Sequence, residues 1–314
     1  MSLVSDPKAI VEALRIFMQP GQVVEIRAPK VRSGRFSNVH FGYFDLDHLD
    51  ELAQAVQKIK TADAIYFMLN PIRHSVHARA YNRIKEFEKG DNTTGDKEII
   101  SRIWLMIDLD AKRDAGISAT DEEKAASLEC AKRVADYLRG LGSPEPVMTD
   151  SGNGYHLYYR IDLPAEDGGL VHRCLEALAD RFNDEKVKVD LSVSNAARIT
   201  KLPGTPVRKG DNTPDRPHRI ARLISAPEEV QLVPLVLLET LAAPPEKGNG
   251  RDGASKGSAT PATKAPIEQF DVAAYLKAKG KNQVLLHDPT PVVPEDSSPA
   301  ESSPLAPTQN AGSE

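Results

Sequence analysis

Runs of apolar residues with a period of two, or of about 3.6, divide residues 1–243 into expected strands and helices. The sharpest strand pattern spans residues 104–110, where an apolar run ends in two aspartates, Asp108 and Asp110. Because side chains alternate between the two faces of a strand, these aspartates share one face. Neighbouring carboxylates repel each other and raise each other's pKa. Taken alone, the pattern fits a solvated strand end as well as a divalent-cation site.

Residues 103–190 follow a definite order of strand and helix patterns. After the aspartate strand, the stretch from Thr120 to Glu123 forms a capping box, and the helix behind it ends near Gly142. In the next turn, Asn153-Gly154 favours positive φ. The later elements are a strand at 146–149, a turn at 151–154, a strand at 155–161, a helix at 170–182 and a strand at 187–190. This β-α-β-β-α-β order predicts an α+β, ferredoxin-like (RRM-like) core, a unit that serves many functions.

We expect three regions along the chain. Residues 1–100 alternate helix and strand patterns and predict an N-terminal α/β module, and residues 101–243 form the ferredoxin-like core. From Pro244 onward Gly, Ser, Pro, Ala and Lys dominate, which predicts a mostly disordered tail at 244–314. Within the tail, residues 267–277 have the spacing of a short amphipathic helix. It is either a docking element for a partner or a transient helix without one.

Composition and charge narrow the class of protein. The chain has 314 residues, of which 40% are hydrophobic and 27% charged, as in ordinary soluble proteins. With a net charge of -5, any nucleic-acid site must be a local basic patch. Cys130 and Cys174 form no CxxC pair, which argues against a zinc site or disulfide framework and fits a reducing cytosol. Neither a signal peptide nor a membrane span is recognisable, so we expect a cytoplasmic protein.

Four chemically active residues fall at the ends of neighbouring strands in the predicted core. Asp108 and Asp110 lie on its first strand, His156 on the third and Asp190 at the end of the fourth. In a ferredoxin-like sheet the first strand lies between the third and fourth, so these residues come close together. Three carboxylates at one place favour Mg²⁺ or Mn²⁺. The layout is typical of a two-metal phosphoryl-transfer site, with the histidine placed to hold a triphosphate.

The densest basic stretch of this acidic chain follows Asp190. Arg198 and Lys201 come closest to that aspartate, and we expect them to contact phosphate groups. The stretch continues with Arg208, Lys209, Arg216, His218, Arg219 and Arg222. For these later residues two interpretations stay open, phosphate contact or a solvated loop with carboxylate partners.

Three motifs at these positions resemble the archaeo-eukaryotic primase superfamily, in its bacterial, plasmid and phage primase–polymerase branch. They are hydrophobic-Asp-hydrophobic-Asp at 107–110, small-x-His at 154–156, and a hydrophobic residue followed by an acid at 189–190. The segment 195–205 also resembles the stretch behind the third motif in this branch. Each motif is weak alone, whereas the three in order on the expected strands are fairly specific.

The resemblance implies a template-directed nucleotidyltransferase, a DNA primase–polymerase acting on single-stranded DNA with NTPs or dNTPs. The catalytic residues and metal ligands, for Mg²⁺ or Mn²⁺, would be Asp108, Asp110 and Asp190. The nucleotide-binding residues would be His156, Arg198 and Lys201. The segment before the sheet would help to hold the template.

Two features depart from many relatives. The chain lacks the cysteines of a zinc module, and it has no GxxxxGK[ST] loop of a fused helicase. We therefore expect a separately encoded helicase as a partner, with the segment 267–277 as its candidate docking element, and no membrane partner.

The alternative from another class is a non-catalytic nucleic-acid-binding replication subunit that retains the same fold. Such a subunit should have lost a carboxylate, and all three are present. A nucleotide cyclase also places two aspartates on this kind of sheet. That function leaves His156, Asp190 and the basic stretch unexplained.

Overall fold

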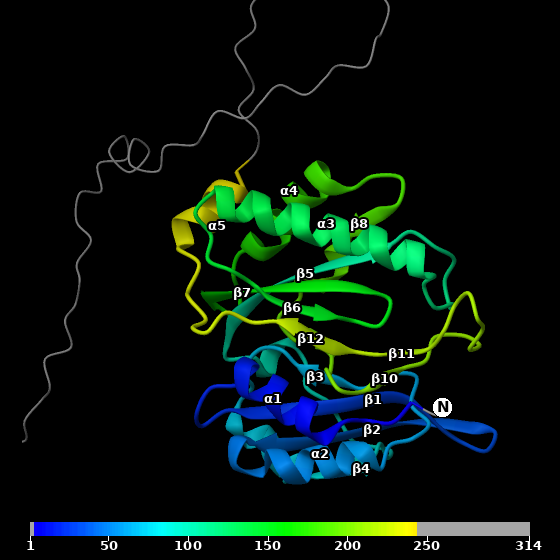
Figure 1. Cartoon of the computed structure of the whole chain (residues 1–314). Coiled ribbons are helices and arrows are strands. Elements are labelled where there is room, and N and C mark those ends of the chain that lie inside the picture. The colour runs from blue at the N-terminus through cyan, green and yellow to red at the C-terminus, as the bar shows by residue number, and fades with distance from the viewer. Residues whose placement is uncertain (1–2, 244–314) are drawn as a thin grey trace, which may run out of the picture. The chain divides into compact units, whose positions relative to one another are not determined.

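The computed structural model describes residues 3–243 (Figure 1). The predicted tail at 244–314 and its helix at 267–277 lie outside the described residues. Among the residues described, no helix combines the length and apolar character needed to cross a membrane. The expected mixed α+β class with antiparallel sheets is confirmed.

One five-stranded sheet contains the elements predicted at 103–190. Its strands lie in the order β12 (Arg222–Ser225), β6 (Val147–Asp150), β7 (Gly154–Pro164), β5 (Ser101–Ala111) and β8 (Val187–Val189), and neighbouring strands are antiparallel. Strand β5 therefore lies between β7 and β8, as the sequence predicts. The helices of this part are α3 (Asp121–Gly140), α4 (Leu170–Phe182) and α5 (Leu235–Leu241).

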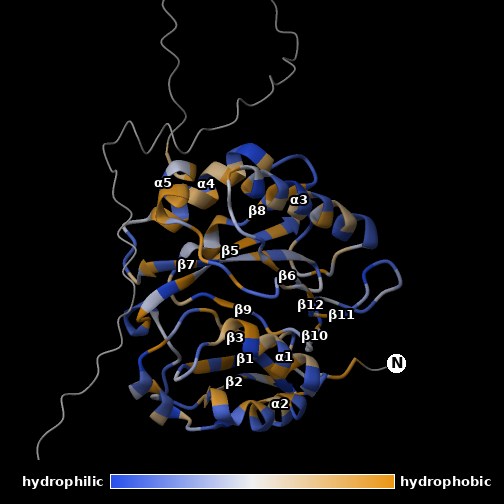
Figure 2. Cartoon of the chain, turned by 60° about the vertical axis from the view of Figure 1, so that its left-hand side comes forward, coloured by the Kyte–Doolittle hydropathy of each residue, from blue (hydrophilic) through white to orange (hydrophobic). Residues whose placement is uncertain are grey.

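Helices α3 and α4 pack on the same sheet through apolar faces at helical spacing. Figure 1 shows both helices over one side of the sheet, and in Figure 2 the outer side of α3 carries hydrophilic residues. The predicted capping box is present, because Thr120 accepts from the amide of Glu123 and Glu123 accepts from the amide of Thr120. Gly142 follows the helix with φ +88°, as a left-handed end requires.

The second five-stranded sheet has the order β4 (Arg83–Glu86), β2 (Phe36–Asp45), β1 (Val23–Ser33), β3 (Tyr66–Met68) and β9 (Ile199–Lys201). In the chain, helix α1 (Pro7–Phe17) precedes β1, and helix α2 (Leu49–Gln57) lies between β2 and β3. Strands β10 (Pro206–Val207) and β11 (Arg219–Ile220) form a separate two-stranded ribbon. The predicted domain boundary near residue 100 stays a prediction. This sheet contains strands from both sides of that boundary, because β9 comes from the later part of the chain.

The ring of Phe17 joins the two sheets at the end of α1. Its centroid lies 5.1 Å from that of Phe67 on β3, 5.2 Å from Trp104 on β5 and 4.9 Å from Tyr158 on β7. The indole nitrogen of Trp104 also donates to the Phe17 carbonyl at 3.2 Å. These buried aromatic contacts help to hold the two sheets together.

The predicted turn between β6 and β7 is present, but the residue with positive φ is not the one that the Asn153-Gly154 pair predicts. The residue with positive φ is Gly152, at +88°, whereas Asn153 is not among the residues with positive φ. Its amide oxygen instead accepts from the backbone of Ala119 at 2.8 Å. A Cβ on Gly152 would lie 2.9 Å from that of Val207, so glycine is required here for space as well as for φ.

Short elements were missed by periodicity. Strands β4, β9, β10, β11 and β12 span two to four residues each, and such runs hold too few positions for a pattern. A 3₁₀ turn at Leu46–His48 precedes α2. Further 3₁₀ turns are found at His74–Arg79, Asp96–Glu98 and Leu191–Ser194.

We expect Thr120→Ala to lower the free energy of unfolding by about 1 kcal/mol, because the amide of Glu123 loses its side-chain acceptor. Thr120→Ser keeps the hydroxyl and should stay within a few tenths of a kcal/mol of the unmodified chain. Urea denaturation followed by circular dichroism measures both. Equal losses in the two variants would contradict a role for the hydroxyl.

Candidate active site

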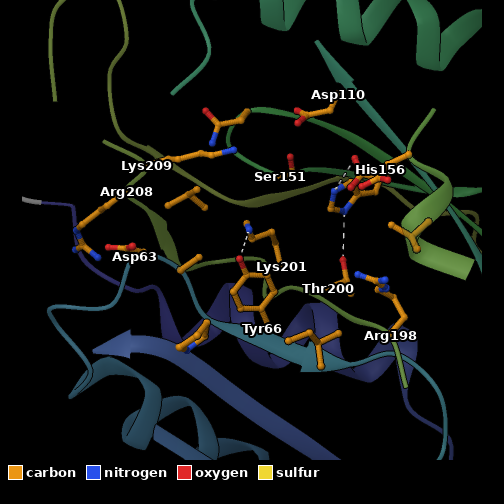
Figure 3. Close-up of a pocket in the computed structure, with 18 of the residues that line it drawn as sticks. Asp63, Tyr66, Asp110, Ser151, His156, Arg198, Thr200, Lys201, Arg208 and Lys209 are labelled. Atoms are coloured by element: carbon orange, nitrogen blue, oxygen red, sulfur yellow. Dashed lines mark hydrogen bonds and ion pairs between the residues drawn. The ribbon is translucent and has the colours of Figure 1, made fainter. Parts of the chain in front are cut away.

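A pocket of about 520 Å³ lies between the two sheets. In Figure 3, Asp110 and His156 lie on one side of it, and Tyr66, Lys201 and Arg198 lie on the other. The first side is formed by β5 and β7, and the second by β3 and β9. The pocket therefore exists only where both sheets are assembled.

The structure brings the predicted carboxylates and the histidine to this one pocket. On β5, Asp108 is paired with His156 of β7, and Asp110 with Gly154. The backbone amide of Asp190, at the end of β8, donates to the carbonyl of Asp108 at 2.9 Å. The three aspartates and His156 all line the cavity. Their grouping follows from strand order and register.

The carboxyl group of Asp108 has a strongly perturbed pKa. Its side chain is 21% exposed. Burial raises the pKa of Asp108 to about 7, with further upward contributions from the charges of Asp110 and Asp190. Lys201 and Arg198 act in the opposite direction without offsetting this rise. The ionised carboxylate is therefore unfavourable near neutral pH unless more positive charge arrives.

Asp110 has a cationic partner that the sequence reasoning missed. Arg113 is buried, and its guanidinium donates two hydrogen bonds to the Asp110 carboxylate at 2.9 and 3.2 Å. Opposite this pair, a Cβ on Gly154 would lie 2.4 Å from the Leu109 carbonyl oxygen and 3.0 Å from a carboxylate oxygen of Asp110. Only glycine fits this position beside the aspartate.

His156 belongs to a buried hydrogen-bond network that crosses between the sheets. Its Nδ1 lies 2.9 Å from the Tyr158 hydroxyl and 3.2 Å from the Thr200 hydroxyl, and the two hydroxyls are 2.6 Å apart. Nε2 faces Asp108 at 3.5 Å. Burial, assisted by the charge of Lys201, lowers the pKa of His156 to about 3. The imidazole is thus neutral at pH 7 and held in orientation by β9.

Two predicted cations form the opposite wall. Lys201 donates to the Tyr66 hydroxyl at 2.5 Å, and its ammonium lies 4.1 Å from the centre of that ring. Arg198 donates to the Ser192 carbonyl through Nη2, and its buried Nε has no acceptor among the described residues. Burial also lowers the pKa of Arg198. A buried donor of this kind is unfavourable until a hydrogen-bond acceptor pairs with it.

The later basic residues divide into two groups. Arg208 and Lys209 line the pocket. Outside it, Arg216 makes a two-pronged ion pair with Glu123 at 2.8 and 2.9 Å, and Arg219 pairs with Asp121 at 2.6 Å. Arg216 and Arg219 therefore have carboxylate partners, as the second interpretation expects, although Arg219 lies on β11 and not in a loop.

The fit to a divalent cation rests on the chemistry of the donors. Within residues 3–243, no three His, Cys, Asp or Glu side chains are arranged to hold a metal ion as they stand. The three aspartates nevertheless provide oxygen ligands. Burial, and after it the charges of Asp110 and Asp190, raises the pKa of Asp108, so its ionised form is unfavourable there. A cation at this position would favour the ionised form. Asp108, Asp110 and Asp190 therefore fit Mg²⁺ or Mn²⁺ in charge and ligand type.

Several residues that line the pocket follow no pattern that can be recognised in the sequence. Tyr66 begins the three-residue strand β3, Asp63 lies just before it, and Arg113 follows β5 in a loop. The spacing of Arg113, three positions after Asp110, is a sequence signal that could have indicated their ion pair.

Comparisons with known proteins add a weak likeness. No protein-family model matches the sequence, and the curated proteins give no match. Among solved structures, the chain is similar to the crystal structure of primase RepB', at 12% sequence identity and a TM-score of 0.43. The alignment covers 75% of this chain and spans 61% of the length of that one. At this level the similarity supports no inference about residues or activity.

The raised pKa of Asp108 predicts a pH-dependent effect of Asp108→Asn. Below pH 3.8, the ordinary pKa, folded and unfolded chains both hold the proton. Between there and about 7 the unfolded chain ionises first, so the unmodified protein loses stability as pH rises. The neutral amide removes this loss. We expect the stability gain of Asp108→Asn to be about 3 kcal/mol larger at pH 8 than at pH 5.

Urea denaturation at the two pH values measures this difference. Asp180→Asn, on the exposed side of α4, is the matched control and should change little at either pH. An equal effect of Asp108→Asn at both pH values would mean that Asp108 ionises as freely in the fold as in the unfolded chain.

Proposed function

We propose that the chain is a template-directed nucleotidyltransferase, a DNA primase–polymerase that acts on single-stranded DNA with two divalent metal ions. The observation that carries this proposal is the position of Asp108, half-buried beside Asp110 and Asp190 opposite a cationic wall. Such a pocket suits a ligand that brings cations to the acidic side chains and anionic groups to the basic side chains. A nucleoside triphosphate with its divalent cations is a ligand of this kind, and about 520 Å³ accommodates a nucleotide.

Asp108, Asp110 and Asp190 would hold Mg²⁺ or Mn²⁺, which supplies activation of the attacking hydroxyl and stabilisation of the leaving pyrophosphate. The chain itself orients these ligands. Arg113 fixes the Asp110 carboxylate through two hydrogen bonds, and the amide of Ser192 donates to Asp190 at 2.9 Å. Preorganised carboxylates avoid reorganisation at the moment of reaction.

The opposite wall would bind the triphosphate. Arg198 offers its unpartnered Nε, and Lys201 is held over the pocket by Tyr66. His156 adds a neutral hydrogen-bond donor beside Asp108. Because it carries no charge, it can donate to a phosphate oxygen without competing with the metal ion for the carboxylates. Together these groups neutralise charge that develops on the phosphates.

The setting of this proposal extends to fold and partners. The element order and the strand order β6-β7-β5-β8 support assignment of residues 101–243 to the ferredoxin-like class. We place the chain in the primase–polymerase branch on its three motifs. Its partners would be single-stranded DNA, NTPs or dNTPs and a separately encoded helicase, in the cytoplasm.

One observation favours a second candidate, a non-catalytic nucleic-acid-binding subunit. The bidentate contact with Arg113 occupies Asp110, which a metal site would need. In a binding subunit the aspartate would stabilise the loop after β5 and nothing more. Activity and metal affinity distinguish the two candidates.

We expect the full chain to synthesise primers on single-stranded DNA with nucleotides and Mg²⁺ or Mn²⁺, and Asp108→Asn to reduce synthesis about 100-fold or more. The amide keeps the size of the side chain but cannot act as an anionic ligand. A denaturing gel with NTPs and dNTPs supplied separately measures the products.

Asp180→Asn is the control and should retain full synthesis. If the intact chain makes no more product than Asp108→Asn, the enzymatic proposal is wrong and the binding subunit remains.

We expect Asp110→Ala to weaken Mn²⁺ binding by about ten-fold or more, because one of three oxygen ligands is lost. Isothermal titration of the full chain with Mn²⁺ alone measures this without any need for activity. Asp180→Ala should bind Mn²⁺ as the unmodified chain does. Unchanged affinity in Asp110→Ala would remove Asp110 from the metal site and leave it as the partner of Arg113.

A further inference from the structure

The hairpin of β1 and β2 extends from the second sheet at the side where the chain begins (Figure 1). Its strands pair up to Ser33 and Phe36, and Gly34 and Arg35 form a two-residue loop. Gly34 has φ +59°, as the tight loops of twisted hairpins require. Residues 32–37 are all exposed. This segment, residues 29–37, is called the hairpin arm below.

A β-bulge connects the hairpin arm to the active-site pocket. The register shifts between Ala28 and Val31, and Lys30 takes φ +58° there. A positive φ is unfavourable for a lysine, and strained bulges of this kind re-aim side chains near functional sites. Pro29 and Lys30 line the pocket between the sheets. The arm is thus continuous with the proposed site of chemistry.

The root of the arm is fixed to the body of the protein. Arg32 forms an ion pair with Asp63, and the Thr61 hydroxyl donates to the Arg32 carbonyl at 2.8 Å. Val31 is buried. These contacts hold the arm in one direction relative to the pocket, because Asp63 lines the same cavity.

The tip of the arm presents an aromatic ring to solvent. Phe36 is 83% exposed, the highest value among the large apolar side chains described. Arg35 precedes it and is exposed as well. Between Glu25 and Asp45 the sequence holds Arg27, Lys30, Arg32 and Arg35 and no acidic residue, in a chain whose net charge is -5. The arm is therefore a local basic element ending in an exposed ring.

We propose that the hairpin arm binds single-stranded DNA on its way to the pocket, with Phe36 stacking on a base and Lys30 and Arg35 contacting phosphates. An exposed ring beside basic side chains is the arrangement that single-strand-binding surfaces use. The bases of a duplex are already stacked and leave no face for Phe36, so the partner is an unpaired strand. This inference rests on the proposed function, since it names the path of that enzyme's template.

The test is fluorescence anisotropy of a labelled oligothymidylate with the full chain, in EDTA and without nucleotide. Phe36→Ala should weaken binding about ten-fold, because the ring that stacks on a base is lost. Phe36→Tyr should bind like the unmodified chain. Ile224→Ala removes another exposed apolar side chain, on β12, and should have no effect.

Stacking itself has a spectroscopic readout. The single tryptophan, Trp104, is buried, so Phe36→Trp adds one exposed indole. We expect oligothymidylate to quench this added emission, and duplex DNA of equal length to leave it unchanged. Arg35→Gln should reduce the slope of log affinity against log salt by about 0.7, and Lys132→Gln, on exposed α3, should not.

Full binding by Phe36→Ala, or equal quenching by duplex DNA, would overturn the assignment of the arm. Neither result touches the chemistry, which Asp108→Asn tests separately. Conversely, Phe36-dependent binding by a chain that synthesises nothing would retain the arm as a single-strand site and reject the proposed enzyme.

Discussion

The passage of one chain segment between the two sheets determines the rest of this structure. Asp190 ends β8 in one sheet, and only nine residues later β9 begins in the other. On β9, Thr200 hydrogen-bonds back to Tyr158 and His156 of the sheet that the chain has just left. This crossing places an acidic wall opposite a cationic one. Asp190 is hydrogen-bonded to β5, whereas the segment with Arg198 and Lys201 pairs along β3.

The pocket concentrates charge that neither wall neutralises alone. Burial beside two other aspartates holds the pKa of Asp108 far above its ordinary range, and the nearest cations are partly engaged by Tyr66 and Ser192. Groups held in unfavourable states are typical of functional sites, since a well-folded protein tolerates the cost locally. Burial, assisted by the charge of Lys201, lowers the pKa of His156, so its chemistry is that of a hydrogen-bonding group and not of a cation.

Sequence reasoning succeeded where the signal extended over many residues. The strand with Asp108, the capped helix behind Thr120 and the order up to Asp190 all follow from periodicity and local capping, and strand order then brought the acids and His156 together. It missed Arg113 and Tyr66, which act through tertiary contacts that no local pattern encodes. Strand β9 was missed for the same reason, because three residues acquire strand geometry only by pairing with β3. The turn at Gly152 shows a further limit, since space beside Val207 decided which residue takes positive φ.

The late position of β9 in the chain has a consequence for biosynthesis. Strand β3 at Tyr66–Met68 pairs with β1 on one side and with Ile199–Lys201 on the other. While the ribosome is still translating the intervening residues, the second side of β3 has no partner strand, and an unpaired edge invites association with other chains. Closing this long loop is among the slower events expected in folding. The second wall of the pocket can therefore be completed only after residue 201 has been synthesised.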